Sequence, residues 1–152
     1  MEITLRELSL EERKPIEMWA DYLKGAKYWG EDVCSILKEL DETELRICAM
    51  FPNDPEPVAF ASVTRHCKEY PYQDGQLWLD HLYVAERARK ARLVEPLYER
   101  QMVYVRHSQG RIFRLPASER IVNFSLKRGW RYHADVPGFP FPVYELPREC
   151  VG

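Results

Sequence analysis

Asp80 and His81 are two ionisable residues that lie side by side within the otherwise apolar run LWLDHLYV, from Leu77 to Val84. A charged group inside such a run must be paired or must line a cavity, because burying it alone costs free energy. A carboxylate or an imidazole at this point could take a proton from an amine near neutral pH. Both residues are therefore candidate general bases, and the alternative for both is a structural ion pair or exposure at a strand edge.

Four cationic residues follow closely after this run: Arg87, Arg89, Lys90 and Arg92. Cationic side chains at this density can bind the phosphate groups of a cofactor or a nucleic acid, or an acidic partner. The alternative is a solvated turn without a ligand. Nucleic-acid binding is the least expected of these functions, because the formal net charge of the chain is only -2 and nucleic-acid-binding domains are usually basic.

The elements around these residues form one strand–helix–strand unit. The apolar run predicts a strand over Leu77–Val84 that is buried on both faces. The helix after it should begin near Leu93, since Pro96 is tolerated only in a first turn, and should end before Gly110. Ile112–Leu115 is predicted to be the second strand. Such units bind anionic ligands at the carboxyl end of the first strand, facing the start of the helix.

The rest of the chain supplies shorter elements on both sides of this unit. Further strands are predicted at 3–8, 45–51, 58–63, 130–133 and 143–146, and further helices after Ser9, over Asp32–Leu40 and within 117–128. The mixed order predicts an α/β fold with a partly antiparallel sheet. A length of 152 residues predicts a single domain over 1–152.

Several function classes are not expected from the sequence. No apolar run is long enough to span a membrane, and the opening MEITLREL lacks the regions of a signal peptide. The histidines show no ligand spacing, so no metal site is predicted. The cysteines form no CxxC pair, which favours reduced thiols and a cytoplasmic protein; they are Cys34, Cys48, Cys67 and Cys150.

The element order and the residues from Leu82 to Trp130 resemble the GNAT superfamily of N-acetyltransferases. Leu82-Tyr83-Val84 fits the Leu-x-Val that ends the central strand in this family, and KRGW at 127–130 matches its later Gly-Phe. The resemblance implies a three-layer α/β domain. Its central sheet would be mixed, mostly antiparallel and of about six to seven strands, with about four flanking helices.

The resemblance also exposes departures at the positions that carry chemistry. The family's pyrophosphate loop reads Arg/Gln-x-x-Gly-x-Gly/Ala, and here Arg89 takes its first position while Arg92 and Val94 take the two small ones. Larger side chains there should crowd a pyrophosphate that approaches the backbone. Ser125 replaces the tyrosine that many members use as general acid, and a serine hydroxyl is too weak an acid for that role. Ser118 replaces an asparagine that is often found near the start of that helix.

The resemblance therefore supports two hypotheses. In the first, the chain transfers an acetyl group from acetyl-CoA to an amine, with Asp80 or His81 as the base. Leu82, Tyr83 and Val84 would then hold the acyl arm, the four cations would hold the phosphates, and Tyr28 and Trp29 could line the acceptor groove. In the second, the chain is a catalytically inactive structural or binding protein, similar to the degenerate GNAT-like internal virion or head-assembly proteins of short-tailed phages. Its partner would then be a protein or an assembly.

Two further expectations bear on these hypotheses. An open cleft beside Val84 that the Arg92 side chain fills would favour the inactive protein. Arg100, Arg106, Arg111 and Arg114 are expected to be ordinary surface residues.

Overall fold

The computed structural model describes residues 2–26 and 32–152. Tyr28 and Trp29, which were expected to line an acceptor groove, lie outside these described residues. The chain divides into two compact units, one of residues 1–63 with 81–101 and the other of 64–80 with 102–152. Each unit has its own core, and the single domain expected over 1–152 stays a prediction.

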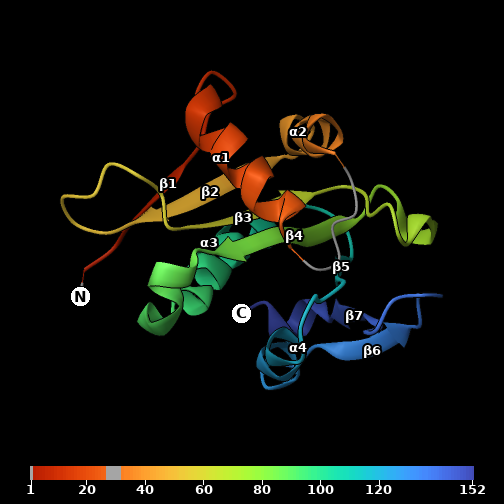
Figure 1. Ribbon diagram of the computed structural model, residues 1–152. Coiled ribbons are helices and arrows are strands. Elements are labelled where there is room, and N and C mark those ends of the chain that lie inside the picture. The colour runs from red at the N-terminus through yellow and green to blue at the C-terminus, as the bar shows by residue number, and fades with distance from the viewer. Residues whose placement is uncertain (1, 27–31) are drawn as a thin grey trace. The chain divides into compact units, whose positions relative to one another are not determined.

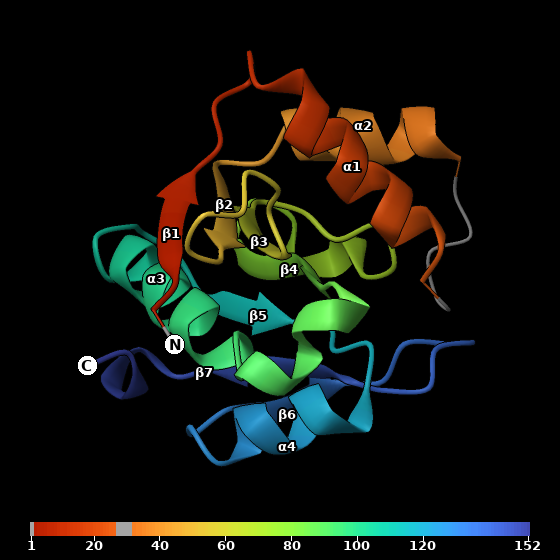
Figure 2. The same cartoon turned by 60° about the vertical axis from the view of Figure 1, so that its left-hand side comes forward.

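Among its described residues, the first unit contains three strands and two complete helices. Its elements are β1 (Thr4–Glu7), α1 (Arg13–Lys24), α2 (Val33–Asp41), β2 (Leu45–Met50) and β3 (Ala59–Thr64, to residue 63). It also includes the second half of β4 (Leu77–Val84), the 3-10 helix η2 (Glu86–Ala91) and residues 94–101 of α3 (Val94–Arg106). Within this unit α1 and α2 lie on one face of the strands and the start of α3 lies on the other (Figure 1 and Figure 2).

The start of α2 follows local capping chemistry, whereas α1 has no side-chain cap. Before α1 the Ser9 N–H donates to the Glu12 carboxylate at 2.8 Å, but the N-cap is Glu12 and not Ser9. The helix begins only at Arg13, which keeps Pro15 within the first turn, where proline costs no hydrogen bond. Asp32 caps α2 by accepting the Ser35 N–H at 2.8 Å.

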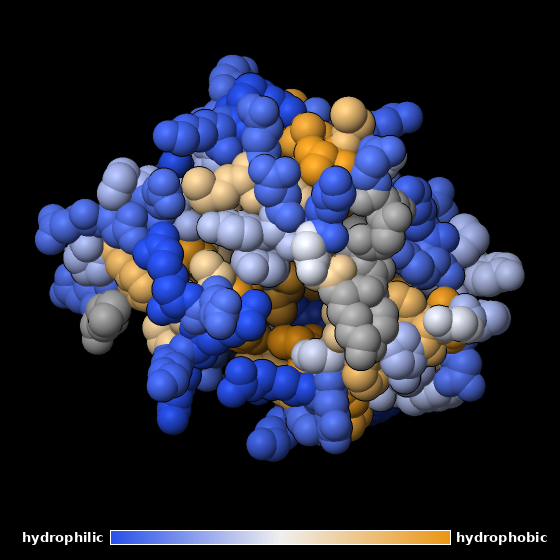
Figure 3. Space-filling model, viewed as in Figure 1, coloured by the Kyte–Doolittle hydropathy of each residue, from blue (hydrophilic) through white to orange (hydrophobic). Residues whose placement is uncertain are grey.

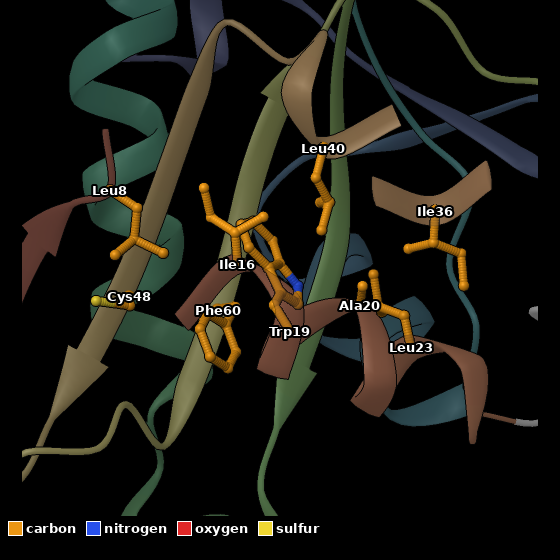
Figure 4. Packing of buried hydrophobic residues seen from close by; sticks show 9 residues of the cluster. All are labelled: Leu8, Ile16, Trp19, Ala20, Leu23, Ile36, Leu40, Cys48 and Phe60. Atoms are coloured by element: carbon orange, nitrogen blue, oxygen red, sulfur yellow. The ribbon is translucent and has the colours of Figure 1, made fainter. Parts of the chain in front are cut away.

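The core of the first unit is the apolar face of α1 and α2 packed on β2 and β3 (Figure 4). The Trp19 ring stacks on Phe60 with centroids 5.0 Å apart, and both side chains are fully buried. Ile16 and Leu23 of α1 and Leu40 of α2 join them. Each such side chain contributes about 1.5–3 kcal/mol through burial, so these helices are held mainly by packing.

The second unit contains the other strands and α4. Its elements are η1 (Pro71–Gln73), the first half of β4, β5 (Ile112–Arg114), α4 (Glu119–Leu126), β6 (Arg131–Ala134), β7 (Val143–Leu146) and η3 (Arg148–Cys150). Trp78 stacks on Phe113 at 5.3 Å in its core. The Arg148 guanidinium donates to the carbonyls of Val105 and Gly110, so a distant side chain satisfies groups at the end of α3.

The described strands form a seven-stranded mixed sheet in the order β1-β2-β3-β4-β5-β7-β6. The pair β4–β5 is parallel, whereas β1–β2, β2–β3, β5–β7 and β6–β7 are antiparallel. The α/β class and the mostly antiparallel sheet predicted from the sequence are thus confirmed. No helix among residues 2–26 and 32–152 is long and apolar enough to cross a membrane.

Two burial predictions were wrong. Arg114, expected at the surface, is only 4% exposed, because it lies on β5, a strand buried along its whole length. The strand β4 was expected to be buried on both faces, but only Leu77–Leu79 and His81 are buried, while Leu82, Tyr83 and Val84 are half-buried. The end of β4 therefore keeps some backbone within reach of solvent.

Candidate functional site at the end of strand β4

The strand β4 changes its backbone conformation in the middle. Leu77, Trp78 and Leu79 pair in parallel with β5, but His81 has a φ of 55°. A left-handed conformation costs a residue other than glycine about 1–2 kcal/mol. Positions of this kind cluster at functional sites, where the surrounding structure holds them in place.

The side chain of His81 is held in a buried polar cluster. Its Nδ1 lies 2.6 Å from Ser62 Oγ and its Nε2 lies 3.5 Å from Glu39 Oε1. Its carbonyl oxygen accepts from Trp19 Nε1 at 2.9 Å. Gln101 Nε2 donates to the Ser62 carbonyl at 2.8 Å. The cluster therefore joins β3 and β4 to α1, α2 and the start of α3.

This burial removes one of the two candidate bases. His81 is only 2% exposed and both ring nitrogens already have contacts, so an amine cannot reach either of them. The order of a carboxylate, an imidazole and a hydroxyl is that of a hydrolase triad. However, Ser62 is 0% exposed, so no acyl group can reach its Oγ.

Asp80 stays the accessible candidate base. Its side chain is partly exposed, in contrast to His81. Asp80 and Cys67 both belong to the second unit. Burial raises the pKa of the Cys67 thiol, and the charges of Asp80 and Glu69 raise it further. A carboxylate at this position could accept a proton from an incoming amine.

The last residues of β4 form a half-buried platform. The Tyr83 ring stacks on Tyr22 of α1 with centroids 4.6 Å apart and an interplanar angle of 9°. The Val84 carbonyl accepts from Arg89 Nε at 3.2 Å, and the next N–H, of Ala85, donates to Val58 at 2.8 Å. A ligand that donates to the Val84 carbonyl must therefore share this oxygen with the Arg89 guanidinium or displace the guanidinium.

The basic turn after β4 is ordered by its own backbone. Residues 86–91 form η2, Arg92 follows with φ 53° and ψ 47°, and α3 begins at Val94. Arg92 thus has the left-handed conformation that glycine adopts without steric cost. Its side chain is exposed. The first N–H groups of α3 have no partner within the helix, and the positive end of the helix dipole lies at the same place.

The four cations of the turn do not converge on one point. Arg87 pairs with Asp54 at 2.7 Å, and this contact lowers the pKa of the Asp54 carboxyl. Arg89 bonds to the end of β4, while Lys90 and Arg92 are exposed. The surface over η2 is predominantly hydrophilic (Figure 3). Arg87 and Arg89 therefore stabilise the turn through contacts within the protein, whereas the exposed Lys90 and Arg92 can be reached by an anion.

The position of the expected general acid in α4 is closed. Ser125 is 0% exposed. Its Oγ donates to the Ile121 carbonyl at 2.7 Å and accepts from Arg114 Nη1 at 3.2 Å. The Arg114 guanidinium also lies over the Trp130 ring, 5.6 Å from its centroid. Ser118 caps α4 by accepting the Ile121 N–H at 3.3 Å, so neither serine presents its hydroxyl to a substrate.

No protein-family model matches the sequence, and no curated protein matches it. Solved structures match it over nearly its whole length. A protein of the GNAT acetyltransferase family from Desulfovibrio desulfuricans has a TM-score of 0.70 and 15% identity, over 97% of this chain and 99% of the other. Ard1 from Thermoplasma volcanium has a TM-score of 0.71 and 16% identity, over 95% of both chains. The Escherichia coli GNAT-family N-acetyltransferase YhbS, in complex with CoA, has a TM-score of 0.66 and 14% identity, over 99% and 84%.

The chain has the GNAT fold. This confirms the fold that the element order predicted. At sequence identities of 14–16%, these matches show a shared fold and nothing about activity or ligands. Within this GNAT fold, the turn after β4 keeps a glycine-like backbone at Arg92, whereas α4 buries Ser125.

Sequence reasoning missed the partners of His81. Ser62 stands in AFASVT and Gln101 in an amphipathic helix, and one polar residue among apolar neighbours does not show what it contacts. Glu39 and Trp19 come from helices whose packing on β4 has no local signal. Groups of three or more metal-binding side chains are absent from the described part of the chain.

Proposed function

We propose that this GNAT-fold chain binds acetyl-CoA at the end of β4 and transfers its acetyl group to an amine. The observation that carries the proposal is the left-handed backbone of Arg92 between η2 and α3. It lies where the resemblance puts a glycine of the pyrophosphate loop. Arg92 therefore has a backbone conformation that a glycine at this position would adopt without steric cost.

The binding role falls mainly on the backbone. The first N–H groups of α3 would face the pyrophosphate, with the exposed cations Lys90 and Arg92 and the guanidinium of Arg89 beside them. The backbone of Leu82–Val84 would hold the acyl arm, and Arg89 would share or release the Val84 carbonyl. Arg87 has a supporting role, because its charge is already paired with Asp54.

The proton-transfer role falls on Asp80. The bound thioester supplies an electrophilic carbonyl, and Asp80 takes the proton of the attacking amine, directly or through one water molecule. Ser125 supplies no acid. Transfer does not strictly need one, because a thiol with a pKa of about 8.5 is a good leaving group near neutral pH.

An assay of thiol release tests this function. Purified protein is incubated with acetyl-CoA and, in turn, a primary alkylamine, a peptide with a free α-amino group and a lysine-containing peptide. We expect release of CoA that depends on one of these amines and a matching increase of 42 Da in its mass, the ordinary mass of one acetyl group replacing a proton. Binding of acetyl-CoA with no amine-dependent release from any class would contradict the catalytic part of the proposal.

A second candidate function is a GNAT-shaped binding protein without catalysis. It is favoured by the burial of Ser125 and His81, which removes two of the side chains that could move protons. The bond from Arg89 to the Val84 carbonyl points the same way, because it occupies a group of the acyl-arm platform. Under this function the chain would bind a protein partner, and the assay above would show no turnover.

A further inference from the structure

We infer that His81 is a positioning residue: with Ser62 and Glu39 it holds the left-handed break in β4 and so sets the backbone of Leu82–Val84 for the cofactor. This inference rests on the proposed function for its link to acetyl-CoA. Its structural part, that the buried cluster controls the end of β4, stands separately. The His81 imidazole is too buried to exchange a proton with a substrate, and the inference gives it a structural role instead.

The first step of the argument is the peptide between His81 and Leu82. Trp19 Nε1 donates to the His81 carbonyl at 2.9 Å. Trp19 is 0% exposed and stacks on Phe60, so the donor cannot move easily. The His81 carbonyl and the Leu82 N–H belong to one planar peptide. Holding the carbonyl therefore fixes the direction of the first N–H of the platform.

The second step is the imidazole, which ties the same residue to two other elements. Ser62 Oγ on β3 lies 2.6 Å from Nδ1, and Glu39 Oε1 on α2 lies 3.5 Å from Nε2. A carboxylate only accepts, so Nε2 carries a proton, and a hydroxyl suits Nδ1 in either charge state. The ring is thus held on both sides, and its backbone cannot return to an extended conformation without breaking these contacts.

The third step separates positioning from ordinary core packing. The cluster lies directly before Leu82–Val84 in the chain, and His81 is the only residue of β4 with a positive φ. Loss of a contact at His81 should therefore loosen the end of β4 in particular. Loss of a buried hydroxyl elsewhere in the first unit should lower stability without that local effect.

The test compares Ser62→Ala with Thr43→Val. Thr43 is a matched control in the first unit: it is 6% exposed, donates to the Leu40 carbonyl at 2.8 Å and accepts from Arg46 at 3.0 Å. Amide hydrogen exchange is measured residue by residue on the full chain without CoA. We expect Ser62→Ala to speed exchange at Leu82, Tyr83 and Val84 about fivefold, as loss of one buried hydrogen bond implies. Thr43→Val should leave those three amides unchanged.

A conservative replacement adds a rescue arm. Asparagine adopts the left-handed conformation readily and its amide can bond to Ser62. His81→Asn should therefore keep exchange at Leu82–Val84 closer to the wild type than His81→Ala does. Equal exchange at these amides in Ser62→Ala and Thr43→Val would overturn the inference, as would equal loss in the two His81 variants.

The acetyl-CoA affinity decides the link to the cofactor. Ser62→Ala should raise the Kd for acetyl-CoA about fivefold, and Thr43→Val should not change it. An unchanged Kd in Ser62→Ala would overturn this link. If the wild-type protein binds no acetyl-CoA, the proposed function fails, while the exchange rates still decide whether the cluster controls the end of β4.

Discussion

The resemblance to the GNAT family implies a replaced residue both in the turn between η2 and α3 and in the helix α4, but the structure gives these two positions opposite environments. At Arg92 a larger side chain replaces a small one, yet the backbone keeps a glycine-like conformation and the side chain stays exposed. At Ser125 the replacement is fully buried and hydrogen-bonded inside the protein.

The contrast shows which chemistry tolerates substitution. A site made of backbone N–H groups needs suitable φ and ψ and enough room for the ligand. A residue other than glycine can reach the left-handed conformation at a cost of about 1–2 kcal/mol. A general acid needs a particular side chain with a particular pKa and access to substrate. Under the proposed function, the turn after β4 would therefore bind the pyrophosphate, whereas Ser125 of α4 would supply no proton.

The largest effect is expected at Asp80, the side chain that accepts the amine proton in the proposed transfer. Asp80→Asn should lower kcat by about 10²–10⁴-fold, because the base that takes the amine proton is lost. The Kd for acetyl-CoA should stay the same. Asp74→Asn, at an exposed carboxylate in the preceding loop, is the control and should retain full activity. Steady-state kinetics and calorimetry check both values, and an unchanged kcat in Asp80→Asn would assign the base elsewhere.

The next effect tests whether α4 is closed to a proton donor. Ser125→Tyr, which restores the family's residue, should destabilise the protein by about 1–3 kcal/mol, because a ring must enter a fully packed site. Ser125→Ala should cost about 1 kcal/mol, from the lost bonds to Arg114 and Ile121. Urea denaturation measures both. A Ser125→Tyr protein of wild-type stability with higher kcat would show that α4 has room for an acid.

A smaller effect compares two neighbouring cations in the turn. Arg92→Gly should raise the free energy of unfolding by up to about 1 kcal/mol, because glycine relieves the left-handed strain. Lys90 has no positive φ, so Lys90→Gly should instead lower stability by about 0.5–1 kcal/mol through backbone entropy. Thermal denaturation of the two variants should thus shift in opposite directions. Equal shifts would contradict the role given to the Arg92 backbone.

The smallest effect is a pH-dependent ion pair in the second unit. Arg111 donates twice to Glu145 at 2.7 Å, and these bonds hold the pKa of the Glu145 carboxyl below its ordinary value. The stabilisation is present above the pKa of the unfolded chain, near 4.3, and disappears as pH falls through the lower folded pKa. Glu145→Gln should cost up to about 1 kcal/mol at pH 7. Denaturation curves of the two proteins should converge once the pH falls below the folded pKa of Glu145, and a constant difference would exclude this pair as the cause.

The sequence predicted the elements well because their signals are local. The strand Leu77–Val84 follows from an apolar run, and the start of α3 near Leu93 follows from Pro96. The burial of Arg114 could not be read in this way, since it depends on the strands beside β5.

The candidate site itself stays a prediction. The sequence placed the basic turn directly after the end of β4, as in the structure, but local patterns carry no information about φ at His81 or Arg92. Arg87 bonds to Asp54, 33 residues away in the chain, and Arg89 bonds to the Val84 carbonyl, 5 residues away. Side-chain partners at such separations become visible only once the chain is folded.

The most direct test of the central claim is calorimetric titration of the wild-type protein with acetyl-CoA, with Arg92→Gly beside it. We predict one-to-one binding by the wild type with a Kd between about 1 μM and 1 mM, the usual range of enzyme substrates, and similar or tighter binding by the variant. Binding by Arg92→Gly alone would mean that Arg92 closes the cofactor site despite its left-handed backbone. Binding by neither protein would contradict the claim that the turn after β4 still works as a pyrophosphate loop.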